Sequence, residues 1–343
     1  MKRKTLIVAT LILLGSMARA QDEGSVLKLD LQGAIDYAMQ HNKNLENARQ
    51  ELIKSDKSVW EAISQGLPQV DASLDYMTNF GFEMEFPSFI PGGEPTKFEL
   101  GDQMTAKMQL SQLVFSGQYI VGIQTAKLAK IISEQALDNS EISTKESVIN
   151  AYYLVLISES SLKMVKENME NLDKILNQTE KMYEAGMAEH IDVDQFQVNV
   201  NQLSNTIRSM NRNLEITYNM LRFTLGIPAG SEIILTDDLE SLFNDKEASD
   251  LLANEFNKES NIGYQILSSQ AAINKKLWDM QKWNYGPTLA GFASATYKIK
   301  TSSFDMNPPF MAGFSLSLPI FSSGMRDAKV GQARIDYEIA ERN

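Results

Sequence analysis

A long helical pattern dominates the middle of the chain. Thr96 to Ile227 is a run of 132 residues without proline, and a helical pattern of apolar positions begins in it at about Gln118. Read as a helix to Glu184, this pattern covers 67 residues, or roughly 100 Å at about 1.5 Å per residue. Helices in compact domains ordinarily have about three to four turns. The pattern therefore predicts a rod or a tube.

Heptad spacing predicts that this helix folds back on a second one. Apolar positions step by three and four residues along two arms, which is the coiled-coil period. They are Leu162, Val165, Met169, Leu172, Leu176, Thr179 and Tyr183, then Val193, Phe196, Val200, Leu203, Ile207, Met210, Leu214, Thr217 and Leu221. Between the arms, Gly186 suits the left-handed residue that ends a helix, and Asp192 with Gln195 resembles a capping box. An antiparallel hairpin with arms of about 67 and about 34 residues follows, and other helices must pack against the unpaired half of the longer arm.

Strict alternation replaces the helical period on the N-terminal side of the long helix. A first helical segment, from about Ala34 to Ile63, ends at Pro68. Val70, Ala72, Leu74 and Tyr76 then alternate with Asp71, Ser73 and Asp75, and Met104, Ala106, Met108 and Leu110 alternate with Thr105, Lys107, Gln109 and Ser111. Both runs have the length and the two-faced character of membrane-spanning strands. A soluble hairpin with one face on a core is the alternative, and Met77–Gln103 is expected to be an exposed loop.

The same order of elements begins a second time. Asn284–Pro287 ends another helical segment, Leu289–Tyr297 weakly matches the first strand, and Ala312, Phe314, Leu316 and Leu318 match the second. The segment Leu110–Gly117 (LSQLVFSG) recurs as Leu316–Gly324 (LSLPIFSSG), and a helix with small residues follows each copy. Internal duplication of this kind sets the architecture.

The N-terminus predicts export. Lys2, Arg3 and Lys4 precede an apolar core at Leu6–Leu14, and Ala18–Ala20 fits the small-x-small cleavage rule, so residues 1–20 are expected to be a signal peptide rather than an uncleaved anchor helix. Cleavage would take the formal net charge from −12 to −16, and an acidic chain is unsuited to nucleic acid. The absence of cysteine excludes a disulfide framework.

In order and spacing, these marks resemble the TolC-type outer-membrane efflux and secretion channels. The matching marks are the Leu31–Ala38 helix, the Gly66–Pro68 junction, the LSQLVFSG entry to the long helix, the Tyr183-x-x-Gly186 tip followed by Asp192-Val193, and the Leu225-Gly226 close of the returning helix. The resemblance implies a mainly α protein with a small antiparallel β part. In a homotrimer, each protomer would give four strands to a shared 12-stranded outer-membrane β-barrel and long helical hairpins to a periplasmic α-barrel.

The resemblance also implies partners and domains. The tip Gly186, Met187, Ala188 and Glu189 would contact a periplasmic adaptor protein, which links the channel to an inner-membrane pump. A first structural repeat is expected over residues 21–227, an equatorial connection over 228–247 and a second, incomplete repeat over 248–343. The family's acidic gate belongs to the region that this second repeat lacks, so no gate residues are assigned.

Two further groups of side chains are candidates for function. Aromatic residues near the strand ends would form membrane-interface girdles, or else ordinary corner packing; they are Tyr76, Phe80, Phe82, Phe115, Tyr119, Tyr297 and Phe321. His190 beside Asp192 and Asp194 is better interpreted as a solvated loop with a helix cap than as a metal site. An acidic lumen would favour cations.

No catalytic constellation is present in the sequence. His41 and His190 are far apart, and neither a phosphate-binding loop nor a nucleophile elbow occurs. The sequence therefore predicts a passive trimeric exit duct of a tripartite efflux or type I secretion system, without cofactor or metal, in the outer membrane and the periplasm. An exported periplasmic helical-hairpin adaptor or scaffold is the alternative, and a secreted helical enzyme is a weaker one.

Overall fold

The computed structural model describes residues 26–80, 82–87, 95–242, 257–300 and 308–343. The expected signal peptide (residues 1–20), the end of the expected connection 228–247 and the first residues of the expected second repeat lie outside the described residues. The chain divides into two compact units, Met1–Asn47 with Asn139–Phe256 and Ala48–Asp138 with Asn257–Asn343. Each unit is described by itself.

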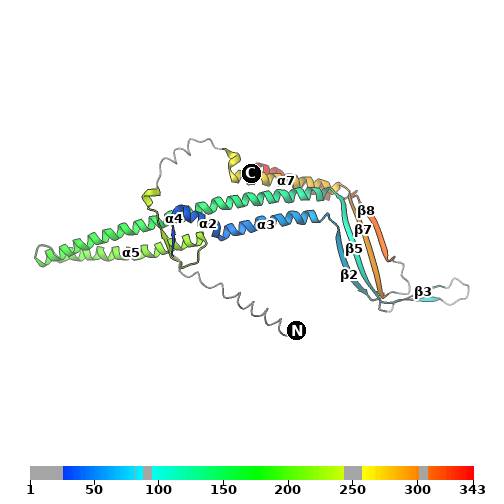
Figure 1. Ribbon diagram of the computed structural model, residues 1–343, viewed down its shortest axis with the longest axis horizontal. Coiled ribbons are helices and arrows are strands. Elements are labelled where there is room, and N and C mark those ends of the chain that lie inside the picture. Colours follow the sequence, from blue (N-terminus) through cyan, green and yellow to red (C-terminus); the bar gives the residue numbers. More distant parts are fainter. Residues whose placement is uncertain (1–25, 81, 88–94, 243–256, 301–307) are drawn as a thin grey trace, which may run out of the picture. The chain divides into compact units, whose positions relative to one another are not determined.

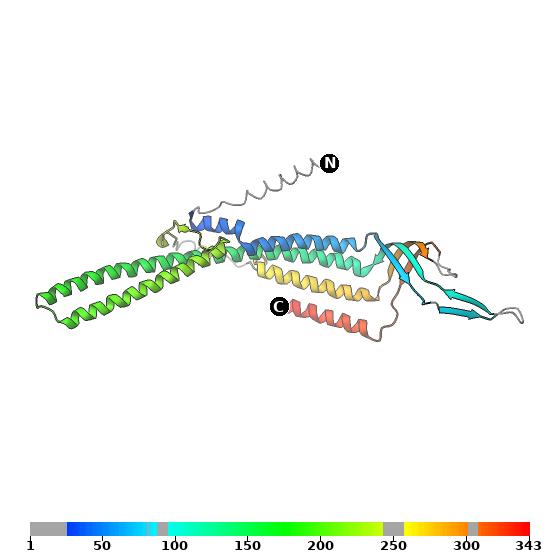
Figure 2. The same cartoon turned by 90° about the horizontal axis from the view of Figure 1, so that it is seen from below.

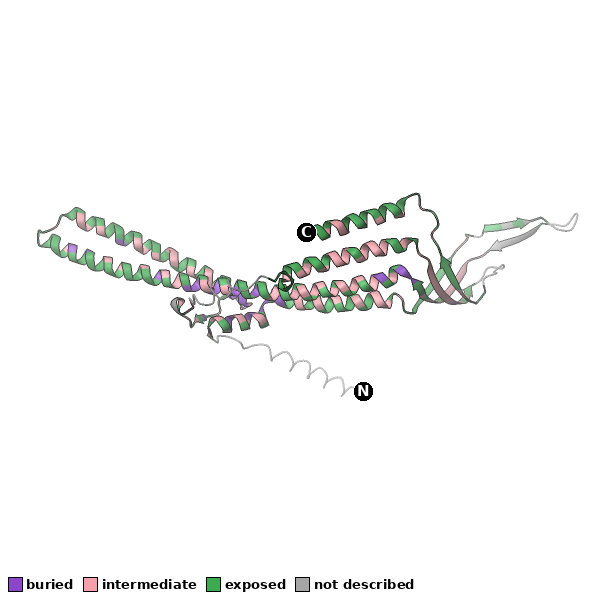
Figure 3. Cartoon of the chain, turned by 90° about the horizontal axis from the view of Figure 1, so that it is seen from above, coloured by how far each residue is buried: buried purple, intermediate pink, exposed green. Residues whose placement is uncertain are grey.

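The first unit contains the expected helical hairpin. Helix α4 spans Gly117–Glu184 and continues into the second unit, while α5 spans His190–Leu225. Figure 2 shows the end of α4 and all of α5 as two antiparallel arms. The heptad seam is confirmed, because between Leu162 and Met220 the buried positions, Leu162, Leu176, Thr179 and Val200, all belong to it. Most other positions near the tip are exposed, as the green parts of the ribbon in Figure 3 show.

Below the hairpin arms, the first unit has a small apolar core. Strands β1 (Leu27–Leu29) and β6 (Ile233–Leu235) pair in parallel beside helix α2 (Leu31–His41). The core residues are Leu29, Ala34, Ala38, Val148, Ala151, Tyr152, Val155, Leu156, Leu221, Leu225 and Ile233. The Tyr152 hydroxyl donates to the carbonyl of Leu29 (3.2 Å) and to the Asp237 carboxylate (3.0 Å). Burial, and then this hydrogen bond to Asp237, raise the pKa of Tyr152 above its usual range.

A second polar cluster fixes the end of α5. The buried guanidinium of Arg222 donates to Glu215 (2.8 Å), to Asn219 (2.8 Å) and to the carbonyl of Ser231 (2.8 Å). It therefore ties the last turns of α5 to the chain that leads to β6.

The first helical segment is not continuous, which corrects the sequence interpretation. It ends as α2 at His41 and begins again as α3 (Lys43–Ser64). Asn42 between them has extended backbone, and its Oδ1 accepts from the N–H groups of Asn44 (2.9 Å) and Leu45 (3.1 Å). Its Nδ2 donates to the carbonyl of Thr224 (2.6 Å). One buried amide thus caps α3 and ties it to α5.

The second unit is built around a four-stranded antiparallel sheet. Its strands are β2 (Gln69–Met77), β5 (Gln103–Ser116), β7 (Thr288–Lys300) and β8 (Phe310–Ser317), in the order β2-β5-β7-β8 (Figure 1). The expected strand pairs are confirmed. The expected loop Met77–Gln103 instead contains a two-stranded hairpin of β3 (Phe82–Phe86) and β4 (Thr96–Leu100).

Helices continue from the strands of the second unit. Besides α3 and the first part of α4, they are α7 (Ile262–Lys282) and α8 (Met325–Arg342), with short 3-10 turns η2 (Lys258–Ser260) and η3 (Trp283–Tyr285). A further turn, η1 (Leu239–Leu242), belongs to the first unit. The rings of Trp278 in α7 and Tyr337 in α8 stack with centroids 6.0 Å apart.

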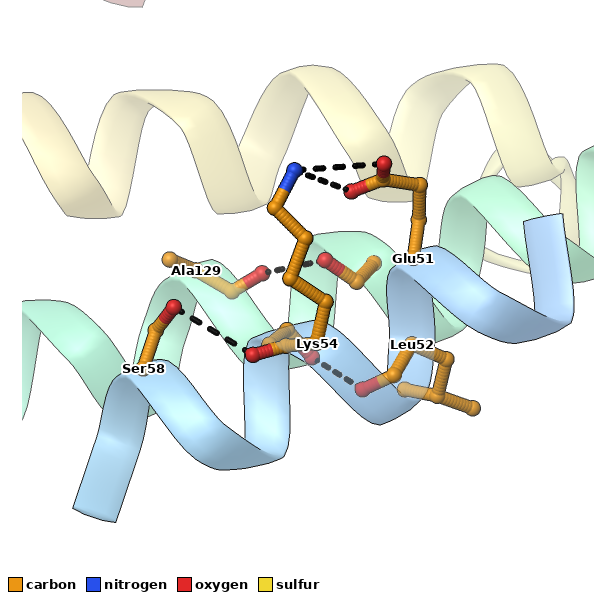
Figure 4. A network of polar contacts seen from close by, with 7 residues as sticks. Glu51, Leu52, Lys54, Ser58 and Ala129 are labelled. Atoms are coloured by element: carbon orange, nitrogen blue, oxygen red, sulfur yellow. Dashed lines mark hydrogen bonds and ion pairs between the residues drawn. The ribbon is translucent and has the colours of Figure 1, made fainter. Parts of the chain in front are cut away.

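Helices α3 and α4 lie side by side in the second unit (Figure 4). Lys130 of α4 reaches Asp56 of α3 at 2.8 Å, and this hydrogen bond raises the pKa of Lys130. The contacts drawn in Figure 4 stay within one helix, such as Lys54 with both carboxylate oxygens of Glu51 (3.2 and 3.0 Å). Exposed ion pairs of this kind contribute little to stability.

Candidate functional site

The four-stranded sheet has one face that is almost wholly apolar. Residues directly opposite in an antiparallel pair lie on the same face, so the register extends each row across the sheet. Val70, Leu110, Ala293 and Ala312 form one row. Ala72, Met108, Ala295 and Phe310 form the next row. The apolar alternation that the sequence showed in separate runs therefore converges on a single surface, which we call the apolar face.

The opposite face, the polar face, carries hydroxyl, amide and charged groups. Its rows are Asp71–Gln109–Ser294–Met311, Ser73–Lys107–Thr296 and Asp75–Thr105–Lys298. The Ser73 hydroxyl donates to the carboxylate of Asp75 at 3.0 Å.

Exposure is reversed relative to an ordinary half-buried sheet. On the apolar face, Met108 is 57% exposed and Phe314 is 78% exposed. On the polar face, Gln109 and Ser111 are half-buried and Ser294 is only 9% exposed. Large exposed apolar surfaces mark contacts with a membrane or with other proteins. The central strands β5 and β7 thus shelter their polar side chains and present their apolar ones outward, whereas every residue of the edge strand β2 is exposed.

The candidate aromatic residues lie towards the two ends of this sheet. Tyr76 pairs with Met104 and Tyr297 with Ala106, near the end that leads to the β3–β4 hairpin. Phe115 lies near the end of β5 that leads into α4. From the Tyr76 row to Phe115 is eleven positions along β5, or roughly 37 Å of strand. At a tilt of about 40° this corresponds to roughly 28 Å, close to the thickness of a membrane's apolar layer.

These aromatic side chains differ in their contacts. Tyr297 is 74% exposed and Phe321 is 85% exposed, as a lipid-facing ring requires. Phe80, just before the β3–β4 hairpin, and Phe82, the first residue of β3, are also exposed. Phe115 instead packs edge-on against Trp283, with ring centroids 6.3 Å apart.

Tyr119 has the contacts of a packing residue. Its hydroxyl donates to the carbonyl of Ile63 at 2.8 Å. Its ring lies so close to Gly66 that a Cβ there would meet it at 2.3 Å. For Tyr119 this geometry favours the corner-packing alternative, and it explains why the junction before Pro68 carries a glycine.

A cluster around Asp102 fixes the sheet end beside the β3–β4 hairpin. The carboxylate accepts from the hydroxyls of Thr78 (2.7 Å) and Tyr76 (3.2 Å), and it forms an ion pair with Lys300 (2.7 Å). It thereby joins the ends of β2 and β7 to the chain entering β5. The sequence alone did not reveal this role of Asp102, because its partners are brought together only by the strand pairing.

The tip of the helical hairpin is closed by local hydrogen bonds. Gly186 has φ of 73°, its N–H donates to the carbonyl of Tyr183 (2.9 Å), and the N–H of Met187 donates to that of Met182 (2.7 Å). These two bonds constitute a Schellman motif, and the expected left-handed Gly186 is confirmed. Met187 is 75% exposed.

The start of α5 corrects the expected capping box. The helix begins at His190 and its N-cap is Glu189, three residues before the expected Asp192. The Asp192 carboxylate accepts from the N–H of Glu189 at 3.1 Å, so it belongs to the third helical position. His190 pairs with Asp194 at 2.9 Å and packs edge-on against Tyr183. These contacts fit the helix-cap interpretation of the tip.

Sites for other chemistry are not found in the described parts of the chain. There, no group of three or more His, Asp or Glu side chains could hold a metal ion. Of the helices in those parts, none is long and apolar enough to cross a membrane.

Comparisons with known proteins identify the fold. A model of the family described as outer membrane efflux protein matches residues 34–227. The crystal structure of the outer membrane protein VceC from Vibrio cholerae matches with a TM-score of 0.66 and 16% identity, over 91% of this chain and 74% of VceC. The CmeC outer membrane channel of Campylobacter jejuni matches with 0.68 and 15%, over 96% and 72%. A structure of CusC matches with 0.69 and 14%, over 94% and 74%.

Proposed function

The chain belongs to the outer membrane efflux protein family, and from this we propose that it forms the exit duct of a tripartite efflux or type I secretion system. Three copies would join their four-stranded sheets into one closed 12-stranded wall in the outer membrane. Their helices would form a tunnel through the periplasm. The duct is passive: a pump in the inner membrane supplies the energy, and this chain catalyses no reaction.

The reversed exposure of the sheet carries this proposal. A strand in lipid must present apolar side chains outward and pair its backbone groups with neighbouring strands. On the two central strands, β5 and β7, the exposed side chains lie on the apolar face and the side chains of the polar face are half-buried or buried, while the edge strand β2 is exposed on both faces. The edges of β2 and β8 are then satisfied by neighbouring copies, since a closed sheet has no free edge.

The hairpin tip is the proposed contact with the periplasmic adaptor. Gly186, Met187, Ala188 and Glu189 connect the two arms, and the Schellman motif holds them in a defined turn. The exposed Met187 side chain offers an adaptable apolar contact at this turn. We expect Met187→Glu to weaken adaptor capture while the hairpin keeps its helix content. Met164→Glu, a change at an exposed position of α4 away from the tip, serves as the control.

Neighbouring positions on β5 test the orientation of the sheet. Leu110 lies on the apolar face and Gln109 on the polar face, and both are close to the middle of the stretch from the Tyr76 row to Phe115. A lysine on the lipid side near the membrane midplane costs about 2–4 kcal/mol. We therefore expect Leu110→Lys to reduce the heat-sensitive trimer in outer-membrane fractions and Gln109→Lys to leave it unchanged.

Two outcomes would contradict the proposal. Equal tolerance of both lysines would mean that the apolar face does not contact lipid. Recovery of the full-length protein as a monomer, without detergent, from the periplasmic fraction would favour the scaffold alternative.

A further inference from the structure

The polar face of the sheet carries balanced charge, and we propose that Lys107 and Lys298 set the ion selectivity of the strand-lined part of the duct. They cancel the cation preference that an acidic chain would otherwise impose there, so that anionic cargo also passes this segment. This inference rests on the proposed function, which makes the polar face the wall of the lumen.

The register places the charged side chains. Among the paired positions of the four strands, the polar face has four charged residues: Asp71 and Asp75 on β2, Lys107 on β5 and Lys298 on β7. The formal charge of this face is therefore zero. The whole chain, in contrast, has a formal net charge of −12.

Among the paired positions, the lysines and the carboxylates belong to different strands. Lys107 lies opposite Ser73 and Thr296, and Lys298 lies opposite Thr105, so neither lysine is directly opposite a carboxylate. In the row of Asp75 and Lys298, two strand spacings separate the two backbones, or roughly 10 Å.

In a ring of three copies, three acidic sectors would alternate with three basic ones. The Debye length at 0.1 M salt is about 10 Å, so an ion passing along the wall would respond to charges of both signs. The segment would then discriminate weakly between cations and anions. Removing the lysines would leave six carboxylates, two from each copy, and would turn the segment into a cation filter.

The test measures reversal potentials of the full-length trimer in planar bilayers under a KCl gradient. For Lys107→Gln/Lys298→Gln we expect the cation-to-anion permeability ratio to rise about two- to fivefold, the size expected for screened charges near the path. Asp71→Asn/Asp75→Asn should shift the ratio in the opposite direction. The control Asp102→Asn/Lys300→Gln removes two charged groups that do not belong to the polar face and leaves the net charge unchanged, so it should leave the ratio unchanged.

Because the chain has no native cysteine, single introduced cysteines can test whether position 107 faces water. We expect Lys107→Cys to react with water-soluble thiol reagents in the membrane. A positively charged reagent should restore the wild-type ratio, and a negatively charged one should raise the ratio further. Leu110→Cys, on the apolar face near the middle of β5, should not react.

The outcomes separate this inference from the proposed function. Conducting trimers whose ratio is the same with and without the lysines would overturn the inference and leave the duct intact. A wild-type protein that forms neither trimers nor conducting pores would overturn the proposed function itself.

Discussion

The two glycines that end the long helices make a matched test of the packing in the first unit. Gly186 and Gly226 have nearly the same φ, 73° and 78°, and each sits in a Schellman motif. Their surroundings differ. A Cβ added at Gly226 would lie 2.3 Å from the backbone oxygen of His41, whereas nothing lies within 4 Å of one added at Gly186. Alanine should therefore be tolerated at one position and not at the other.

The magnitudes follow from these geometries. A left-handed alanine costs about 1 kcal/mol, which is the whole expected effect of Gly186→Ala. Gly226→Ala adds overpacking of about 1–3 kcal/mol against a carbonyl that cannot rotate away, because Asn42 next to it is bonded to the end of α5. At about 2 cal/mol/K per residue, we expect apparent melting shifts of about 1.5 °C and about 5 °C.

Far-UV circular dichroism of the full-length protein in detergent measures these shifts. They are read as apparent midpoints, since a membrane trimer does not unfold in two states. Gly122→Ala is the control, because an added Cβ meets nothing within 4 Å there and alanine favours a helix interior. Equal losses at Gly186 and Gly226 would refute the reasoning.

Three further changes probe polar contacts. Tyr152→Phe should cost about 1.5–3 kcal/mol, because it removes a buried hydrogen bond to the Asp237 carboxylate. The pKa of Tyr152 is raised in the folded protein, so the unfolded chain loses its phenol proton first as the pH rises. The stability of the wild type should therefore fall above about pH 10, and that of Tyr152→Phe should fall less. Denaturation of both proteins at pH 8 and pH 11 measures the two effects. Asp192→Asn should cost about 0.5–1 kcal/mol by weakening its bond to the Glu189 N–H and its favourable charge at the start of α5, seen as faster hydrogen exchange at the tip. Asn42→Ala should cost about 2 kcal/mol, because it removes the cap of α3 and leaves a carbonyl of α5 without its donor; an unchanged melting midpoint would contradict this.

The sequence predicted the features that repeat at a fixed period. The heptad seam placed α4 and α5 to within a few residues, because each seam residue reports the same face of the helix. Alternation assigned the strand faces, because a shift of one residue would turn every side chain over. The features it missed depend on single long-range contacts, such as Asn42 with the end of α5 and Asp102 with Lys300.

The exposure of the two sheet faces matters most for function, and the sequence predicts it only in part. Alternation shows that a strand has an apolar and a polar side, but both a soluble sheet and a membrane sheet have that pattern. Which side is sheltered depends on how the four strands curve together, and no single strand records that. The assembled sheet separates the two possibilities, because on β7 the polar-face Ser294 is 9% exposed while Tyr297 on the apolar face is 74% exposed. The duplicated alternating pattern predicted the strands, and the packing of the four strands into one sheet supplies the argument for a duct.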